Sequence, residues 1–188
     1  MAVQLLRKKF TVGQYHQMVE TGILTDRDRV ELLQGEIIEM SPVRRQHAAC
    51  VDRLNELLVL GLSTRAIVRV QSPIWLGNSS EPQPDVAILR RRPDFYAEAH
   101  PLAEDVLALV EVSDTTVEFD RTVKVPLYAQ DGIAEVWIVD LKAGAMEVYR
   151  EPRGDGYQQV QMFRRGDVIG FQAFIDTQFT VPVDQILG

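Results

Sequence analysis

Two apolar segments in the middle of the chain each contain one acidic residue where a buried strand ordinarily has none. The first spans residues 84–89 and contains Asp85, and the second spans 107–113 and contains Glu111. Apolar runs of this length predict strands buried on both faces. A buried carboxylate needs a partner, because an isolated charge is costly to remove from water. The two segments therefore predict neighbouring strands whose acids share a divalent cation.

A basic residue completes this set. Lys124 lies in a predicted helical segment after Glu111. Two acids and an amine are the groups that metal-assisted phosphodiester hydrolysis requires. In this arrangement Asp85 and Glu111 would hold Mg²⁺ or Mn²⁺ with help from the backbone carbonyl of Val112. Lys124 would orient the attacking water or offset charge on the phosphorus.

The rest of the sequence predicts an α/β fold, a sandwich with a central mixed sheet flanked by helices. We expect helices over about 11–22, 41–61 and 115–130, a hairpin over 29–40, and strands at 67–71, 74–76, 84–89, 107–113 and 135–140. The turn of the hairpin is Gln34-Gly35. Ser41-Pro42 is expected to start the second helix and Gly61 to end it, while Thr115 and Glu118 have capping-box spacing.

Length and composition indicate one globular domain. The chain has 188 residues, 46% of them hydrophobic, which is enough for one substantial core. We expect a core over about 10–151 and a C-terminal β extension over about 152–188. The sequence lacks an apolar run of membrane-spanning length, and its N-terminal charges follow a short apolar segment, unlike a secretory signal. Its single cysteine, Cys50, cannot form an internal disulfide. We therefore expect a cytoplasmic protein without a membrane partner.

The charge balance bears on nucleic-acid binding. A net charge of -7 disfavours nonspecific attraction to phosphate, so local basic clusters would have to compensate. Four short clusters exist, at residues 7–9, 44–45, 90–92 and 164–165. Each taken alone is typical of a solvated turn.

Several motifs together resemble a known family. They lie at residues 26–38, 84–87, 111–113, 120–124 and 128–140. Over about 10–151 the chain resembles the Uma-type endonucleases of the PD-(D/E)xK superfamily. The resemblance implies the restriction-endonuclease-like fold, metal ligands at Asp85 and Glu111, and a catalytic lysine at Lys124. It further implies a Mg²⁺-dependent DNA endonuclease, with DNA as substrate and a homodimer as the assembly.

One departure from the superfamily pattern concerns the lysine. The usual lysine, two residues after the second acid, is replaced by Ser113. The lysine role would therefore move to Lys124 on the following helix. Asp120, four residues earlier, would hold that lysine by an ion pair.

Accessory roles are assigned to Glu36, His47 and Asp120. Glu36 would reach the metal from the hairpin, and His47 would contact the scissile phosphate. Each has an ordinary alternative, because Glu36 could be an exposed residue after a turn and His47 a surface or capping residue. Asp85 could equally bind backbone amides, and Glu111 could pair with an arginine.

Three functions remain to be distinguished. The first is the endonuclease, and the second is a noncatalytic nucleic-acid-binding or regulatory module that retains the nuclease fold. A carboxylate-pair glycosidase is disfavoured, because it would bind sugar on aromatic surfaces and would not need the lysine. Trp75, Trp137 and Tyr128 are instead expected in the core.

Overall fold

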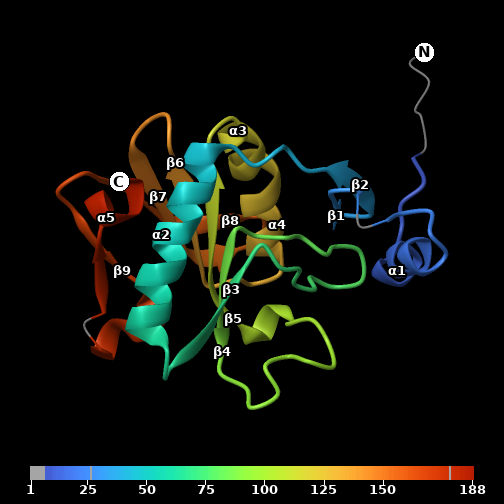
Figure 1. Ribbon diagram of the computed structural model, residues 1–188, viewed down its shortest axis with the longest axis horizontal. Helices are drawn as coiled ribbons and strands as arrows, with labels where there is room; N and C mark the ends of the chain where they lie inside the picture. Colours follow the sequence, from blue (N-terminus) through green and yellow to red (C-terminus); the bar gives the residue numbers. More distant parts are fainter. Residues whose placement is uncertain (1–6, 26, 178) are drawn as a thin grey trace.

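The computed structural model describes residues 7–25, 27–177 and 179–188 (Figure 1). Its centre is a six-stranded mixed sheet with the order β3-β4-β5-β6-β7-β8. The strands are β1 (Val30–Leu33), β2 (Glu36–Glu39), β3 (Ala66–Val70), β4 (Val86–Arg90), β5 (Val106–Ser113), β6 (Glu135–Asp140), β7 (Ala145–Arg153), β8 (Gly156–Arg164), β9 (Val168–Gly170) and β10 (Thr180–Pro182). The α-helices are α1 (Val12–Glu20), α2 (Arg45–Leu62), α3 (Val117–Phe119), α4 (Val125–Gln130) and α5 (Val183–Leu187), and shorter helical turns cover Ala103–Asp105, Asp120–Lys124 and Gln172–Thr177.

Alternation along the strands separates the core into two layers. In β5, Val110 and Val112 face a cluster that includes buried residues of α2 and α5, whereas Leu109 faces a cluster that includes α4. Successive strand residues point to opposite faces, so one apolar strand can serve both layers. The fold is therefore an α/β sandwich with helices on both faces of the sheet, and the predicted fold class is confirmed.

The N-terminal hairpin forms as predicted but outside the central sheet. Strands β1 and β2 pair with each other in a two-stranded sheet and lie beside α1, to the right of the main sheet in Figure 1. Leu32 of β1 also forms an isolated bridge with Glu81. Gln34 and Gly35 both have positive φ, at 49° and 80°, which are the angles of a type I′ hairpin turn. Thr11 caps α1 in a capping box with Gln14. The hairpin thus places β1 at one end of the central sheet.

Helix α2 differs from its prediction at both ends. It begins at Arg45 and not at Ser41, because the residue before Pro42 disfavours helical geometry and Arg44 is still extended. Gly61 does not end the helix, which continues to Leu62. A Cβ atom at Gly61 would lie 1.9 Å from the ring of Phe179. This glycine is needed for close packing and not for termination.

The predicted helical segment over 115–130 is present but irregular. Its N-cap is Thr116 and not Thr115, and the Thr116 hydroxyl bonds to the Asp120 side chain instead of capping the backbone. Residues Asp120–Lys124 form a π-helical turn closed by the Val125 N–H donating to the Asp120 carbonyl. Pro126 follows immediately, and its missing N–H disfavours regular α-helical bonding at this point. The irregular part of the helical segment is therefore the turn that contains Asp120 and Lys124, the two residues that face the sheet.

The C-terminal part is more than a β extension. β7 and β8 are long strands of the central sheet, and the chain ends in the short helix α5. Phe171 stacks on the buried Trp137 ring, with centroids 3.8 Å apart and planes 3° apart. The C-terminal segment thus completes the core on the α2 side.

The segment 74–76, predicted as a strand, makes only isolated bridges.

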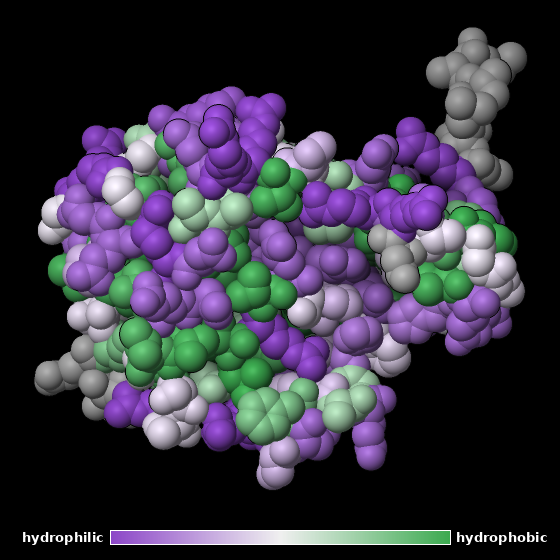
Figure 2. Space-filling view, in the orientation of Figure 1, coloured by the Kyte–Doolittle hydropathy of each residue, from purple (hydrophilic) through white to green (hydrophobic). Residues whose placement is uncertain are grey.

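Most of the face seen in Figure 2 is polar, and apolar side chains gather over the lower, C-terminal half of α2. The large apolar residues exposed on this helix are Val59 and Leu60. Within the described ranges, the chain contains no helix long and apolar enough to cross a membrane.

Candidate active site

The two strand acids lie next to each other at one end of the sheet. β4 and β5 pair antiparallel with Val86 opposite Val110, so the next step of the register places Asp85 opposite Glu111. By strand alternation Glu111 points to the face that carries Leu109, whereas Asp85 lies just before β4 and its carboxylate contacts His47 of α2. The Asp85 Oδ2 atom accepts a hydrogen bond of 2.9 Å from the Val112 N–H. The fold therefore brings two carboxylates together on adjacent strands.

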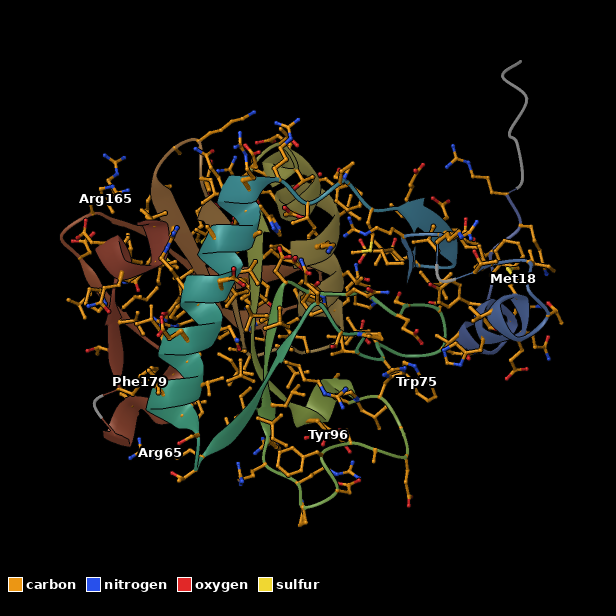
Figure 3. The ribbon with its side chains drawn as sticks, viewed as in Figure 1. Met18, Arg65, Trp75, Tyr96, Arg165 and Phe179 are labelled. Atoms are coloured by element: carbon orange, nitrogen blue, oxygen red, sulfur yellow. The ribbon has the colours of Figure 1, made fainter. Side chains whose placement is uncertain are left out.

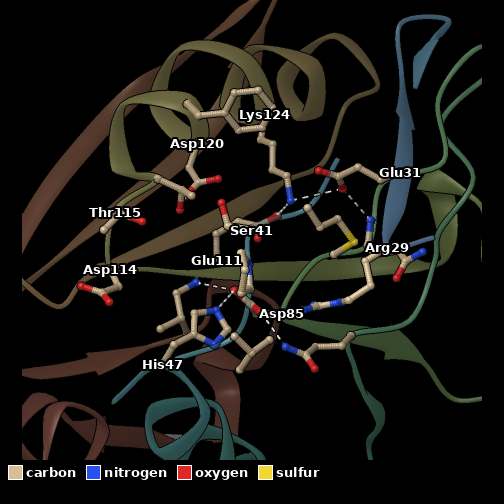
Figure 4. A pocket seen from close by; sticks show the side chains of 18 of the residues that line it. Arg29, Glu31, Ser41, His47, Asp85, Glu111, Asp114, Thr115, Asp120 and Lys124 are labelled. Carbon is tan, nitrogen blue, oxygen red and sulfur yellow. Dashed lines mark hydrogen bonds and ion pairs between the residues drawn. The ribbon is translucent and has the colours of Figure 1, made fainter. Parts of the chain in front are cut away.

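These acids line a cleft of about 370 Å³ (Figure 4). The cleft is bounded by the end of the sheet, the π-helical turn, the start of α2 and the N-terminal hairpin. Its charged lining comprises Arg29, Glu31, Glu39, Arg44, His47, Asp85, Glu111, Asp114, Asp120 and Lys124. All three residues predicted to carry the chemistry, namely Asp85, Glu111 and Lys124, lie in this cleft.

Lys124 bridges two buried acids. Its Nζ atom lies 3.2 Å from Glu111 Oε1 and 3.3 Å from Glu31 Oε2, and its side chain is only 7% exposed. The predicted ion pair between Lys124 and Asp120 is not formed. Asp120 instead accepts hydrogen bonds of 2.6 Å and 2.9 Å from the hydroxyls of Ser113 and Thr116. Ser113, at the usual lysine position, therefore orients Asp120.

Two residues of this network escaped the sequence analysis. Glu31 is a buried acid in the apolar strand β1, and it accepts a 3.0 Å hydrogen bond from the Gln83 N–H in addition to pairing with Lys124. Its signal was the same single acid in an apolar strand that identified Asp85 and Glu111. The Tyr128 ring is buried, as predicted, but its hydroxyl donates a 2.5 Å hydrogen bond to Glu111 Oε1. A tyrosine fits an apolar pattern, so the sequence gives no sign that the Tyr128 hydroxyl bonds to Glu111.

Burial and charge shape the titration of the cleft. Burial raises the pKa of Glu111 to about 8, against the opposing influence of the Lys124 ammonium. Burial alone would lower the pKa of Lys124, but the surrounding carboxylates, led by Glu111 and Glu31, raise it above its ordinary value. Burial also raises the pKa of Asp120. Several acids thus surround one lysine, an excess of negative charge that a cation would relieve.

His47 approaches the same acids from the first turn of α2. Its Nε2 atom lies 3.1 Å from Asp85 Oδ2, and this hydrogen bond raises the pKa of His47. The Nδ1 atom is buried and has no hydrogen-bond partner among the described residues. His47 therefore contacts Asp85, while its predicted contact with a phosphate remains a prediction.

Glu36 and most of the basic clusters lie elsewhere. Glu36 is not part of the cleft lining and pairs with Arg7 and Lys9 at 3.4 Å and 3.3 Å. Of the four clusters, only the one at 44–45 reaches the cleft, where Arg44 lies 3.4 Å from Asp114. The hairpin contributes Glu31 to the site in place of Glu36.

The donor set suits a hard cation. Among the described residues, histidine, cysteine and acidic side chains nowhere form a three-membered cluster able to enclose a metal. The protein ligands would thus be Asp85, Glu111 and the Val112 carbonyl, with water completing the shell. Mg²⁺ fits such a set, because it retains several waters and takes few carboxylates.

The arrangement of a mixed sheet between helices is shared with a solved structure. A crystal structure described as a putative nuclease belonging to DUF820 from Anabaena variabilis matches with a TM-score of 0.74 and 13% identity, covering 95% of this chain and 97% of that one. This similarity shows the fold. The type IIG restriction endonuclease BpuSI matches with a TM-score of 0.43 and 16% identity over 79% of this chain and 17% of that one, too weakly to support an argument.

The family model described as Uma2, "Putative restriction endonuclease", matches residues 12–184. The chain belongs to this family, as its motifs predicted. No curated protein matches the chain.

Proposed function

We propose that this protein is a Mg²⁺- or Mn²⁺-dependent endonuclease that hydrolyses phosphodiester bonds of DNA. The observation that carries the proposal is the register that sets Asp85 opposite Glu111 in a cleft with the Lys124 ammonium 3.2 Å from Glu111. Membership in a family described as restriction endonucleases supports DNA as the substrate. We further propose a homodimer, since two symmetry-related sites suit cleavage of both strands, and a cytoplasmic setting.

A bound divalent ion would polarise a phosphoryl oxygen and acidify a water. The chain's own residues hold and orient the reacting groups. Val112 N–H and His47 fix the Asp85 carboxylate, while Tyr128 and Lys124 fix one oxygen of Glu111. The Lys124 ammonium then lies at the edge of the acidic pair, where it can offset negative charge that develops on the phosphate.

The test is cleavage of plasmid DNA with Mg²⁺ or Mn²⁺ at low ionic strength, where dissolved cations compete least with the arginines of the protein for the DNA phosphates. We expect nicking that chelator stops and that Asp85→Ala and Glu111→Ala each abolish. Glu36→Gln, outside the cleft, is the matched control and should cleave normally.

The replacement of the superfamily lysine by Ser113 favours one alternative, a noncatalytic nucleic-acid-binding or regulatory module with the nuclease fold. Wild-type protein that binds DNA but leaves it intact with every divalent metal tested would support this alternative over the endonuclease.

A further inference from the structure

The outer edge of the central sheet is formed by β8. This strand is the last in the sheet order and, among the residues that the structure describes, pairs only with β7. Its central residues, 158–162, are exposed on both faces of the sheet. Val160 and Met162, which share one face, are 56% and 54% exposed. A strand with an open edge and two open faces is a template for another strand.

This edge has none of the usual protection against such pairing. Residues 157–163 are Tyr-Gln-Gln-Val-Gln-Met-Phe, without a charge, proline or glycine. Edge strands of monomeric proteins are ordinarily interrupted by lysine, proline or a bulge. The opposite edge, β3, contains Arg69, whose guanidinium donates a 2.9 Å hydrogen bond to the Phe95 carbonyl of a loop beside it. The two edges of the sheet are therefore unlike.

Charged residues flank β8 at both ends. Arg153 and the exposed Asp155 precede the strand, and Arg165 and Asp167 follow it. Arg165 lies at the periphery near α5, 3.3 Å from Asp184 Oδ1 (Figure 3). Two copies of β8 in antiparallel orientation bring the residues before each strand opposite the residues after the other, so the order of the charges decides which registers are favourable.

We propose that β8 is the dimer interface, where it pairs antiparallel with β8 of a second copy and joins the two sheets into one. A two-fold axis through Val160 places Asp155 opposite Arg165 of the second copy. It also sets Val160 beside its own mate, with Met162 diagonal to it, so the exposed apolar side chains cover each other. This interface deepens the homodimer part of the proposed function.

Neighbouring registers are disfavoured by charge. Moving the axis one residue toward the N-terminus opposes Arg153 to Arg165 of the second copy. Moving it one residue toward the C-terminus opposes Asp155 to Asp167. Only the register centred on Val160 places opposite charges at both pairs of ends, because it also sets Arg153 against Asp167.

The chain allows a direct test with a single engineered thiol, because its one cysteine, Cys50, is buried. We expect the wild type to have twice the chain mass by light scattering. Under mild oxidation Val160→Cys should form a disulfide-linked dimer in high yield, since symmetry places the two thiols side by side. Leu60→Cys, on the exposed apolar face of α2, is the matched control and should remain largely unlinked.

A charge variant tests the same contact without oxidation. Val160→Lys places two ammonium groups together at the axis and should halve the mass, whereas Val19→Lys, at an exposed residue of α1 (47%), should leave the dimer intact. A monomeric wild type would overturn the proposal. So would a dimer that links through Leu60→Cys but not through Val160→Cys, which would place the interface on α2. A wild type that cleaves DNA as a monomer would refute this interface but support the endonuclease. A wild type that dimerises through β8 but does not cleave DNA would support the interface and refute the endonuclease.

Discussion

Tyr128 and Glu111 are joined by a buried hydrogen bond of 2.5 Å between the phenolic oxygen and Glu111 Oε1. The same carboxylate oxygen also contacts the Lys124 ammonium. The tyrosine comes from α4 and the acid from β5, so this hydrogen bond connects helix α4 to the cleft. Two donors at one oxygen hold the carboxylate in a single orientation.

Removal of this hydroxyl is therefore expected to destabilise the protein. Tyr128→Phe leaves a buried carboxylate oxygen short of one donor, which should lower the free energy of unfolding by about 1 to 3 kcal/mol. The measurement is urea unfolding at pH 7. The control is Tyr157→Phe, which removes a 2.8 Å hydrogen bond to the neutral carbonyl of Ile133 and should cost less. Equal losses in the two variants would argue against a special role for Tyr128.

His47 is expected to titrate above His100. The hydrogen bond that His47 donates to the Asp85 carboxylate raises the pKa of His47, whereas burial lowers the pKa of His100. Because the folded-state pKa of His47 is raised, its stabilising contribution is full below the unfolded value of about 6.5 and is lost as pH rises through the folded value. NMR titration of the imidazole protons checks this order, with His47→Gln to assign the signal. A His47 signal that titrates at or below that of His100 would contradict the contact with Asp85.

Gly61 illustrates a packing requirement inside a helix. Gly61→Ala would place a methyl group against the ring of Phe179 and should destabilise the fold by about 1 to 3 kcal/mol, despite the better helix propensity of alanine. Gly13→Ala in α1 is the control, because its nearest neighbour would be 4.0 Å away. That change should be neutral or stabilising by up to about 1 kcal/mol. Thermal melting of the two variants distinguishes them, and a stabilised Gly61→Ala would show that Phe179 moves freely.

The sequence was sufficient wherever a local rule determines the structure. The Gln34-Gly35 turn and the capped helix α1 follow from short-range backbone preferences, and Asp85 and Glu111 stand out against apolar neighbours. The ends of α2 were mispredicted because the role of Gly61 depends on Phe179, far away in the chain. Asp120 was mispredicted for a similar reason, since helical spacing favours a bond to Lys124 while the fold offers Ser113 and Thr116.

The partners of Lys124 show the same limit. Its bond to Glu31 joins the hairpin to the π-helical turn, and helical periodicity contains no information about a contact between two such distant elements. Only the packing of the hairpin against the sheet end shows that Glu31, and not Glu36, faces the site.

Lys124 gives the sharpest separation of a catalytic site from a structural ion pair. Lys124→Met leaves Glu111 and Glu31 buried without their shared cation, and breaking such a pair should cost about 3 to 5 kcal/mol above about pH 8, where Glu111 is ionised. The loss should shrink as the pH falls through this value toward 7, because Glu111, whose pKa burial raises to about 8, takes up a proton instead. Asp85→Asn should cost little or even stabilise the metal-free protein, because it relieves repulsion from Glu111.

A divalent metal should stabilise the folded protein if the cleft binds it. Mn²⁺ should raise the Tm of the wild type, since it binds only the folded cleft, and should raise that of Asp85→Asn less. Lys124→Met should still show a higher Tm with Mn²⁺ but should no longer cleave DNA. The Lys124 ammonium stabilises the negative charge that develops on the phosphate during the reaction, and it does not bind the metal ion. A melting series on these three proteins, with and without Mn²⁺, measures the stability change in each variant and the effect of the metal on each Tm. A wild type that ignores Mn²⁺, together with a large loss of stability in metal-free Asp85→Asn, would make the cluster a structural ion-pair network.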